Sequence, residues 1–251
     1  MDLGRDLLAI LRVGGFFLAA PVFGSGVVPL WVRTALSLVV GMALAPLSHG
    51  PVPTALLPYL LVAGKEVLVG LGMGYVVNLI LAAVQYAGGV LDLQMGFGMS
   101  QVVNPAMGVP APILTNLLYF VALVLFIVSG GLESLLLALG ASFRLLPLGA
   151  AHLGAGTLPL FIGWGADIFT LGLSLALPVL AVLLILNLAL GILSRAVPQL
   201  NVFILGMPLQ AVFGLLVLVV SLPAMDLALR PVFAGMAGQL LKLVGAVGGS
   251  A

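Results

Sequence analysis

The chain has 251 residues, of which 63% are hydrophobic and 6% charged, and its net charge of +1 comes from scattered single side chains. Soluble domains carry about 25% charged residues, so this composition indicates an integral membrane protein, and the lack of a basic cluster excludes nucleic acid as a partner. The sequence has no cysteine and only two histidines, His49 and His152. Thiolate chemistry is therefore excluded, and neither a metal site nor a cofactor is expected.

Long uncharged segments predict the membrane helices, because an ionised group at mid-bilayer costs about 2.5–3.5 kcal/mol and a span needs roughly 20 residues. In chain order these segments are Val13–Val32, Thr34–Gly64, Val67–Leu91, Leu93–Leu132, Ile168–Ser194 and Ala196–Met225. The sequence thus predicts an all-α membrane protein with about six hydrophobic helices arranged as hairpins, in a single membrane domain over residues 1–251. Leu145–Ala166, rich in Pro and Gly, is predicted to be a loop, and Asp226–Gly245 a short amphipathic helix.

The third span carries small and polar residues on one helical face, at alternating steps of three and four. This polar stripe consists of Tyr75, Asn78, Ala82, Gln85, Gly89, Asp92 and Gly96. In lipid such a face allows close helix packing; alternatively, it lines a conduit. Gly70 and Gly74 form a Gly-xxx-Gly pair in the same helix, which carries little weight because the chain has 33 glycines.

Residues 92–110 interrupt the apolar sequence between the third and fourth helices with Gly, Met, amide side chains and two prolines. Broken backbone of this kind leaves amide groups unsatisfied in hydrocarbon, so the segment must lie in protein, in water or in a pore. Its side chains of interest are Met95, Phe97, Met99, Asn104, Pro105 and Met107. In an apolar chain, methionines such as these three commonly fill gaps in the protein core. Flexible Met side chains also suit an adaptable seal.

The fifth span repeats the polar pattern with Asn187, Gly191 and Arg195 at steps of four, followed by Pro198 and Gln199. Together with Asn78, Gln85 and Asp92, these residues are predicted to form polar helix-packing faces. Two acids in apolar surroundings, Asp92 and Glu133, require a partner or a neutral state. A hydrogen-bonded structural acid is the favoured interpretation for both, with a proton relay as the alternative.

No enzymatic chemistry is visible in the sequence. Seven carboxylates are spread thinly, and the adjacent Lys65 and Glu66 point to different faces of a helix. The Gly-x-Ser-x-Gly elbow, the Walker phosphate loop and the His-Glu-x-x-His helix are all missing from the sequence. The chain is therefore not expected to be an enzyme.

Two stretches resemble the signature regions of the FliR family of flagellar biosynthetic proteins, and more distantly its virulence relatives of the SctT type. They are Asp92–Met99 followed by Val103–Ala106, and Leu186–Leu209. Many members carry Asp before the proline where this chain has Asn104, which leaves a role for charge at that position in doubt, although Asn keeps the ability to form a turn.

The resemblance implies a subunit of the type III protein export gate, multi-pass in the bacterial inner membrane at the flagellar basal body. It implies a FliP-like half (1–139) with a plug loop at 92–110, and a FliQ-like half (140–251) that ends in the amphipathic helix. The implied partners are FliP-like and FliQ-like subunits in a hetero-oligomer, FlhB-like and FlhA-like proteins, membrane lipid and the exported unfolded polypeptides. The subunit would form and seal the pore, with Met95, Phe97, Met99, Asn104, Pro105 and Met107 as plug or gasket residues.

Two rival interpretations stay open at the level of sequence. A stand-alone secondary transporter would bind a small substrate between broken helices, but should show matching interruptions in two halves, and no internal repeat connects the two interruptions found here. The other rival is a purely structural scaffold of the pore, without a role in gating.

Overall fold

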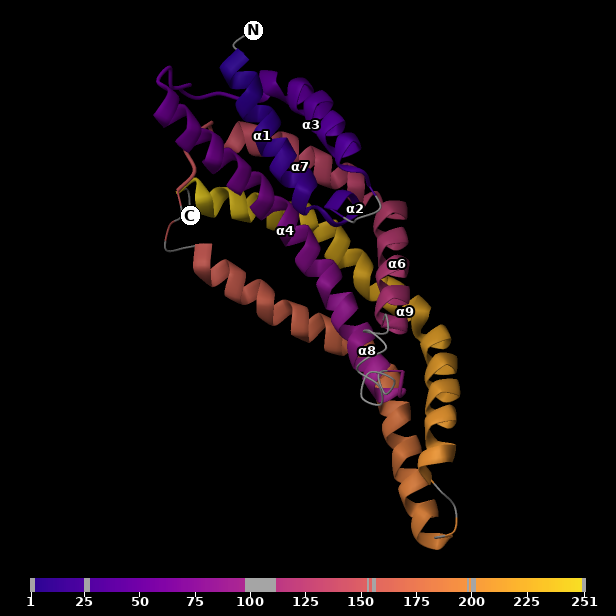
Figure 1. Cartoon of the computed structure of the whole chain (residues 1–251). Coiled ribbons are helices and arrows are strands. Elements are labelled where there is room, and N and C mark those ends of the chain that lie inside the picture. The colour runs from indigo at the N-terminus through magenta and orange to yellow at the C-terminus, as the bar shows by residue number, and fades with distance from the viewer. Residues whose placement is uncertain are drawn as a thin grey trace. The chain divides into compact units, whose positions relative to one another are not determined.

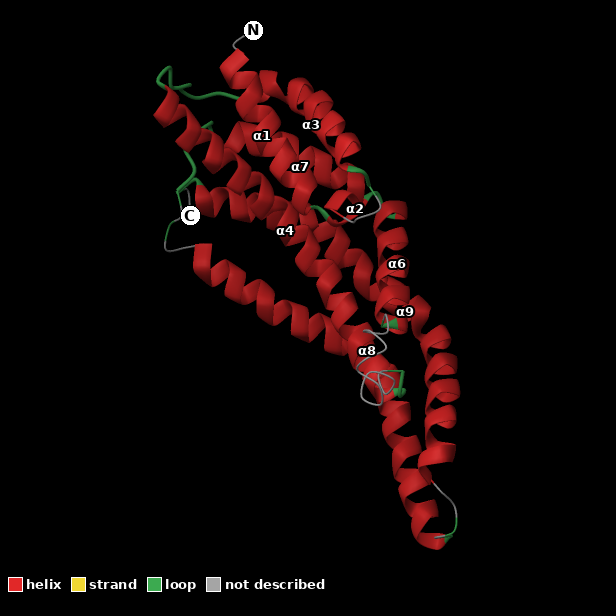
Figure 2. Cartoon of the chain, viewed as in Figure 1, coloured by secondary structure: helices red, strands yellow, loops and turns green. Residues whose placement is uncertain are grey.

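A computed structural model describes residues 3–24, 28–97, 112–152, 154, 157–197, 199 and 202–249. Within these residues the fold consists of helices joined by short loops, without β-strand (Figure 2). In chain order (Figure 1) the helices are α1 (Leu3–Ala19), α2 (Pro21–Gly24), α3 (Leu30–Leu44), the 3₁₀ turn η1 (Ala45–Leu47), α4 (Leu56–Gln94), α6 (Ile113–Val128), α7 (Gly131–Leu145), α8 (Thr157–Ala196) and α9 (Val202–Val247). The prediction of an all-α membrane protein is confirmed.

Four of the described helical segments are long and apolar enough to cross a membrane, or five if the bent pair α6 and α7 counts as one span. The four are Leu30–Leu47, Leu56–Gln94, Thr157–Ala196 and Ile204–Val247. The described residues therefore contain four or five candidate membrane spans, where about six were expected, and three of these spans have 39 to 44 residues.

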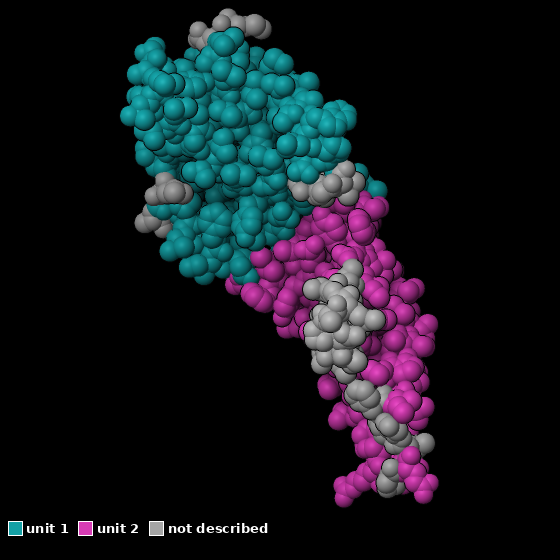
Figure 3. All heavy atoms as spheres, in the orientation of Figure 1, with its two compact units in different colours: residues 1–80, 126–165, 232–251 teal, residues 81–125, 166–231 magenta. Residues whose placement is uncertain are grey.

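The chain forms two compact units, which are interleaved in sequence (Figure 3). Unit 1 comprises residues 1–80, 126–165 and 232–251, and unit 2 comprises residues 81–125 and 166–231. Each unit draws on both predicted halves, 1–139 and 140–251, so that a division of the chain at residue 139 stays a prediction about ancestry.

Unit 1 contains α1, α3, α7 and parts of α4, α8 and α9, together with both chain termini (Figures 1 and 3). Helices α1 and α3 lie side by side because Gly41 of α3 packs on Ile10, where an added Cβ would come within 2.7 Å of the Ile10 Cα. Its core is aromatic and aliphatic, with Leu8, Phe16, Phe17, Met73, Leu139, Phe143, Met236 and Leu240 among the fully buried side chains.

Unit 2 contains the end of α4, most of α6, and the antiparallel hairpin of α8 and α9. The α8 helix approaches α4 closely at Gly172, where an added Cβ would lie 2.5 Å from the Ala83 carbonyl oxygen. Beside this contact the rings of Tyr86 and Phe169 pack edge to face, with centroids 5.2 Å apart.

The predicted boundaries were wrong in three places. Lys65 and Glu66 lie in the interior of α4, because Glu66 is paired and does not have to reach water. The predicted loop Leu145–Ala166 is shorter, since α8 already begins at Thr157. The segment Asp226–Gly245 is not a separate amphipathic helix, because α9 continues through Pro208, Pro223 and Pro231 without a break.

Candidate functional site

The predicted plug loop leaves the end of α4 and returns at the start of α6. The structure describes its first part, residues 92–97, whereas Met99, Asn104, Pro105 and Met107 lie outside the described residues. The described residues of this segment form the base of the loop.

Asp92 fastens the base of the loop. Its carboxylate is 5% exposed and accepts hydrogen bonds from the Leu114 amide at 2.9 Å, the Thr115 amide at 3.0 Å and the Thr115 hydroxyl at 2.8 Å. These two amides belong to the first turn of α6, where backbone N–H groups have no partner within the helix and the helix dipole favours a negative charge. Asp92 thus caps α6 from another helix, and the prediction that it is hydrogen-bonded is confirmed; its role as a structural acid stays a prediction.

Gly88, one turn before Asp92, allows this approach of α4 and α6. A Cβ at Gly88 would lie 2.5 Å from the Thr115 Cα and 2.8 Å from its amide nitrogen, so any larger residue would push the two backbones apart. The two residues on one face of α4 therefore hold the same point of α6.

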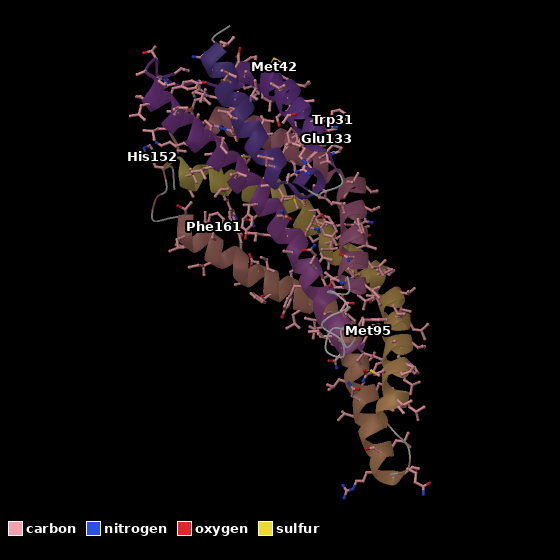
Figure 4. The ribbon with its side chains drawn as sticks, in the orientation of Figure 1. Trp31, Met42, Met95, Glu133, His152 and Phe161 are labelled. Carbon is pink, nitrogen blue, oxygen red and sulfur yellow. The ribbon has the colours of Figure 1, made fainter. Side chains whose placement is uncertain are left out.

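The helix α4 ends where the loop begins, at Gly96. The φ angle of Gly96 is +83°, a left-handed conformation in which glycine commonly terminates a helix, and the Gly96 amide donates to the Leu93 carbonyl at 3.3 Å. Just before it, Met95 is 1% exposed and packs over Gly214 of α9 (Figure 4). Met95 is therefore part of the core of unit 2, whereas Phe97 is half-buried.

The residues of the polar stripe of α4 differ in their exposure to solvent. Tyr75, Asn78 and Gln85 are exposed, and Asp92 is buried. The opposite face of the helix supplies buried apolar side chains, among them Val76, Val77, Leu81, Val84 and Leu91. Asn78 uses its amide to donate to the Ala19 carbonyl at 3.0 Å. The helix therefore buries its apolar face inside the chain and leaves most of its polar face outside.

The second predicted polar face lies on the hairpin of unit 2. Asn187 of α8 accepts a hydrogen bond from Gln210 of α9, which joins the two helices. Gly191, Arg195 and Gln199 are exposed, and Pro198 lies outside the described residues. Glu133 is exposed in the first turn of α7, where the helix dipole favours its charge.

A buried ion pair in unit 1 escaped the sequence analysis. Arg12 and Glu66 are both 0% exposed, and the Arg12 Nε lies 2.5 Å from the Glu66 carboxylate. The remaining Arg12 nitrogens donate to the carbonyls of Ser142 and Leu146, each at 3.2 Å, and the Gly149 amide donates to Glu66 at 2.8 Å. These five residues form what we call the Arg12–Glu66 cluster, which joins α1, α4, α7 and the loop after α7.

The cluster meets the requirement for a stable buried pair, because every charged group has hydrogen-bond partners. The Arg12 guanidinium also lies 4.5 Å from the ring centroid of Phe143, a favourable cation–π geometry. A signal was available in the sequence: Arg12 lies four residues from Leu8 and four from Phe16, on the apolar face of α1 rather than at its end.

The Gly70 and Gly74 pair, given little weight from sequence, lies at the contact of α4 with α1. A Cβ at Gly70 would overlap the Arg12 carbonyl oxygen, and one at Gly74 would come within 2.6 Å of the Phe16 carbonyl oxygen. Gly15 of α1 lies equally close to α4, because a Cβ there would overlap the Val67 carbonyl oxygen and come within 3.0 Å of the Leu71 nitrogen. The two backbones therefore touch, which is how small residues hold membrane helices together.

No group of three or more His, Asp or Glu side chains that could hold a metal ion occurs within the described ranges. Polar and charged groups of both units are used for joining helices. The helices and their apolar composition define an integral membrane protein.

Comparison with known proteins identifies the family. Residues 5–236 match the family described as bacterial export proteins, family 1, and the chain belongs to this family. It is similar to the flagellar biosynthetic protein FliR of Escherichia coli, at 34% identity over 85% of this chain and 82% of that protein, and to FliR of Bacillus subtilis, at 33% over 96% and 95%. It is also similar to the secretion system apparatus protein SsaT of Salmonella typhimurium, at 33% over 63% and 61%.

Family membership makes the chain a component of a type III export apparatus and not an enzyme. The resemblance seen in Asp92–Met99 and Leu186–Leu209 is thereby confirmed at the level of the family.

Replacing Asp92 by alanine is expected to loosen the start of α6. Loss of a helix cap costs about 0.5–2 kcal/mol, and here it leaves two amides and a hydroxyl without their acceptor. Hydrogen exchange of the full chain in detergent micelles should show the Leu114 and Thr115 amides exchanging roughly 5–30 times faster, the factor that corresponds to one or two kcal/mol. The control is Asp226→Ala, an acid of α9 that pairs within its own helix, which should leave these amides unchanged; equal effects of the two variants would contradict the capping role.

Proposed function

We propose that the chain is a subunit of the flagellar type III protein export gate, and that it forms and seals the inner-membrane pore through which unfolded flagellar proteins are exported. The observation that carries the proposal is the anchored base of the loop 92–110. Asp92 binds the first turn of α6, so the two ends of the loop are held together. A loop closed in this way has its ends fixed by protein, as broken backbone at membrane depth requires.

The proposed roles divide the loop residues between its base and its seal. Met95 and Phe97 belong to the base, with Met95 buried over Gly214. We assign the seal itself to Met99, Asn104, Pro105 and Met107. Flexible thioether side chains adapt to an irregular gap, and an apolar constriction can close a pore by excluding water.

The surface of the chain supports a place within a hetero-oligomer. Tyr75, Asn78 and Gln85 are exposed on α4, and polar side chains that face lipid are costly, so this face fits against protein or water. The partners we propose are FliP-like and FliQ-like subunits, with FlhB-like and FlhA-like proteins in the same apparatus. Trp31 and Met42, which are 72% and 55% exposed on α3 (Figure 4), fit either a partner or lipid.

Assembly is tested by native mass determination of the full chain, co-expressed with its partner subunits and purified in mild detergent. The expected result is a large hetero-oligomer that holds one copy of this chain. A homogeneous monomer or homodimer that transports a solute in liposomes would overturn the proposal in favour of a secondary transporter.

Sealing is tested separately, by ion leak through the assembled complex. Deletion of Asn104–Pro110, or the double variant Met99→Ser with Met107→Ser, is expected to raise the leak without loss of assembly. The matched control is Met42→Ser, which changes an exposed methionine of α3 and should leave the leak unchanged. An unchanged leak in the loop variants, with normal assembly, would reduce the chain to a scaffold of the pore.

A further inference from the structure

Unit 1 contains a cavity of about 380 Å³ that the proposed function does not use. Its walls come from α4, from the loop after α7, and from the first turns of α8 and the last turns of α9. The lining residues are Lys65, Leu68, Val69, Gly72, Ala151, His152, Thr157, Phe161, Leu243, Val244 and Val247. The volume is within the range of about 300–1,000 Å³ that small-molecule sites occupy.

The walls of the cavity are almost entirely apolar. Leu68, Val69 and Gly72 of α4 face Leu243 and its neighbours on α9, and Phe161 projects from the first turns of α8 (Figure 4). A polar ligand would gain little from these apolar side chains, because they offer no hydrogen bonds. A hydrocarbon chain would be complementary to them.

Polar groups enter the lining from Lys65, His152 and Thr157 alone. The Thr157 hydroxyl is used, since it donates to the Gly154 carbonyl. Lys65 donates to the Gly149 carbonyl at 3.4 Å, and an ammonium group has three donors, so it retains capacity for a second acceptor. The ring of His152 can donate from either nitrogen according to its tautomer, and its backbone is held by the Val247 carbonyl at 2.8 Å.

The positive charge of Lys65 is not balanced within the cavity. None of the lining residues is acidic. The neighbouring Glu66 is committed to Arg12 and to the Gly149 amide in the Arg12–Glu66 cluster. The cavity therefore combines a hydrocarbon-like interior with a cationic group, and its ligand should combine a hydrocarbon chain with an anion.

We propose that this cavity binds an anionic phospholipid, with one acyl chain among Leu68, Gly72, Phe161 and Leu243 and with the phosphate at Lys65 and His152. Three of the helices that form it, α4, α8 and α9, are long and apolar enough to cross a membrane, so that a phospholipid is at hand. Basic pockets between membrane helices bind anionic headgroups for the same reason. The site concerns lipid recognition by this chain and does not depend on the plug loop.

The test uses phosphatidylglycerol with a photoactivatable group in its acyl chain, added to the full chain in detergent micelles and to the assembled complex. We expect the label on residues of the cavity, and competition by unlabelled phosphatidylglycerol but not by phosphatidylcholine or inorganic phosphate. Filling the cavity with Gly72→Leu should abolish labelling there. The matched control is Gly64→Leu on the same helix, where an added Cβ meets nothing within 4 Å, and it should label as the unmodified chain does.

The charge is tested with Lys65→Gln, which should weaken phosphatidylglycerol binding about fivefold, the contribution of one lysine near an anionic lipid. Lys242→Gln, an exposed cation outside the lining, is the control and should bind as before. Three results would overturn the proposal: equal labelling of all variants, equal competition by phosphatidylcholine, or labelling that is lost in the assembled complex because a partner subunit cross-links to the cavity instead.

Discussion

Replacing Arg12 by methionine is expected to lower the free energy of unfolding by about 3–5 kcal/mol, the cost of leaving one charge of a buried pair without its partner. Glu66, which is fully buried, would keep the Gly149 amide but lose the guanidinium. The carbonyls of Ser142 and Leu146 would lose their donors as well. Denaturant unfolding of the full chain in detergent micelles measures the change.

The double variant, Arg12→Met with Glu66→Met, distinguishes charge from shape. It removes both charges at similar volume, and buried pairs replaced in this way are often no less stable, so it should recover most of the loss. The control is Arg230→Met, which breaks an exposed pair with Asp226 on α9 and is expected to change stability little. If Arg12→Met cost no more than Arg230→Met, the Arg12–Glu66 cluster would have no role in holding unit 1 together.

Two glycines of α4 are expected to respond to alanine with opposite signs. Gly70→Ala places a methyl group onto the Arg12 carbonyl oxygen, so α1 and α4 must separate, at a cost of about 1–3 kcal/mol or more. Gly64→Ala meets nothing within 4 Å and should stabilise the helix by about 0.5–1 kcal/mol, because alanine loses less backbone entropy than glycine. The same unfolding measurement compares them.

A gain of equal size in both variants would show that the glycines matter only through helix propensity. A loss confined to Gly70 would show that the backbone contact of α1 with α4 stabilises unit 1. The second result also predicts that Gly74→Ala is harmful, because its Cβ would lie within 2.6 Å of the Phe16 carbonyl oxygen.

Single charges in the sequence do not mark the ends of α4. The charges of Lys65 and Glu66 predict the end of one helix and the start of another, yet α4 runs from Leu56 to Gln94. An ionised group marks the end of a span only if it has to reach water, and Glu66 is satisfied by Arg12 from a helix 54 positions earlier in the chain. No local pattern contains that partner.

The polar positions were predicted more successfully than their partners. Asp92 was expected to be a hydrogen-bonded acid, and it binds the first turn of α6. Asn187 was expected in a helix-packing face, and it joins α8 to α9 through Gln210. In both cases periodicity identified the residue, because a polar side chain in apolar sequence needs a partner, but periodicity does not say which residue supplies it.

The sequence by itself determined the class of protein, since a chain that is 63% hydrophobic and 6% charged can satisfy its backbone in a membrane only as helices or as a closed barrel, and long apolar segments favour helices. It also determined which polar residues would be costly to bury without a hydrogen-bond partner, among them Asp92 and Asn187. The tertiary structure alone decided how those costs are met: which helix Asp92 caps, which carboxylate Arg12 finds, and where Gly70 lets two backbones touch. The physical reason is that burial makes each polar group depend on a neighbour close in space, and the folded chain brings those neighbours from distant positions in sequence.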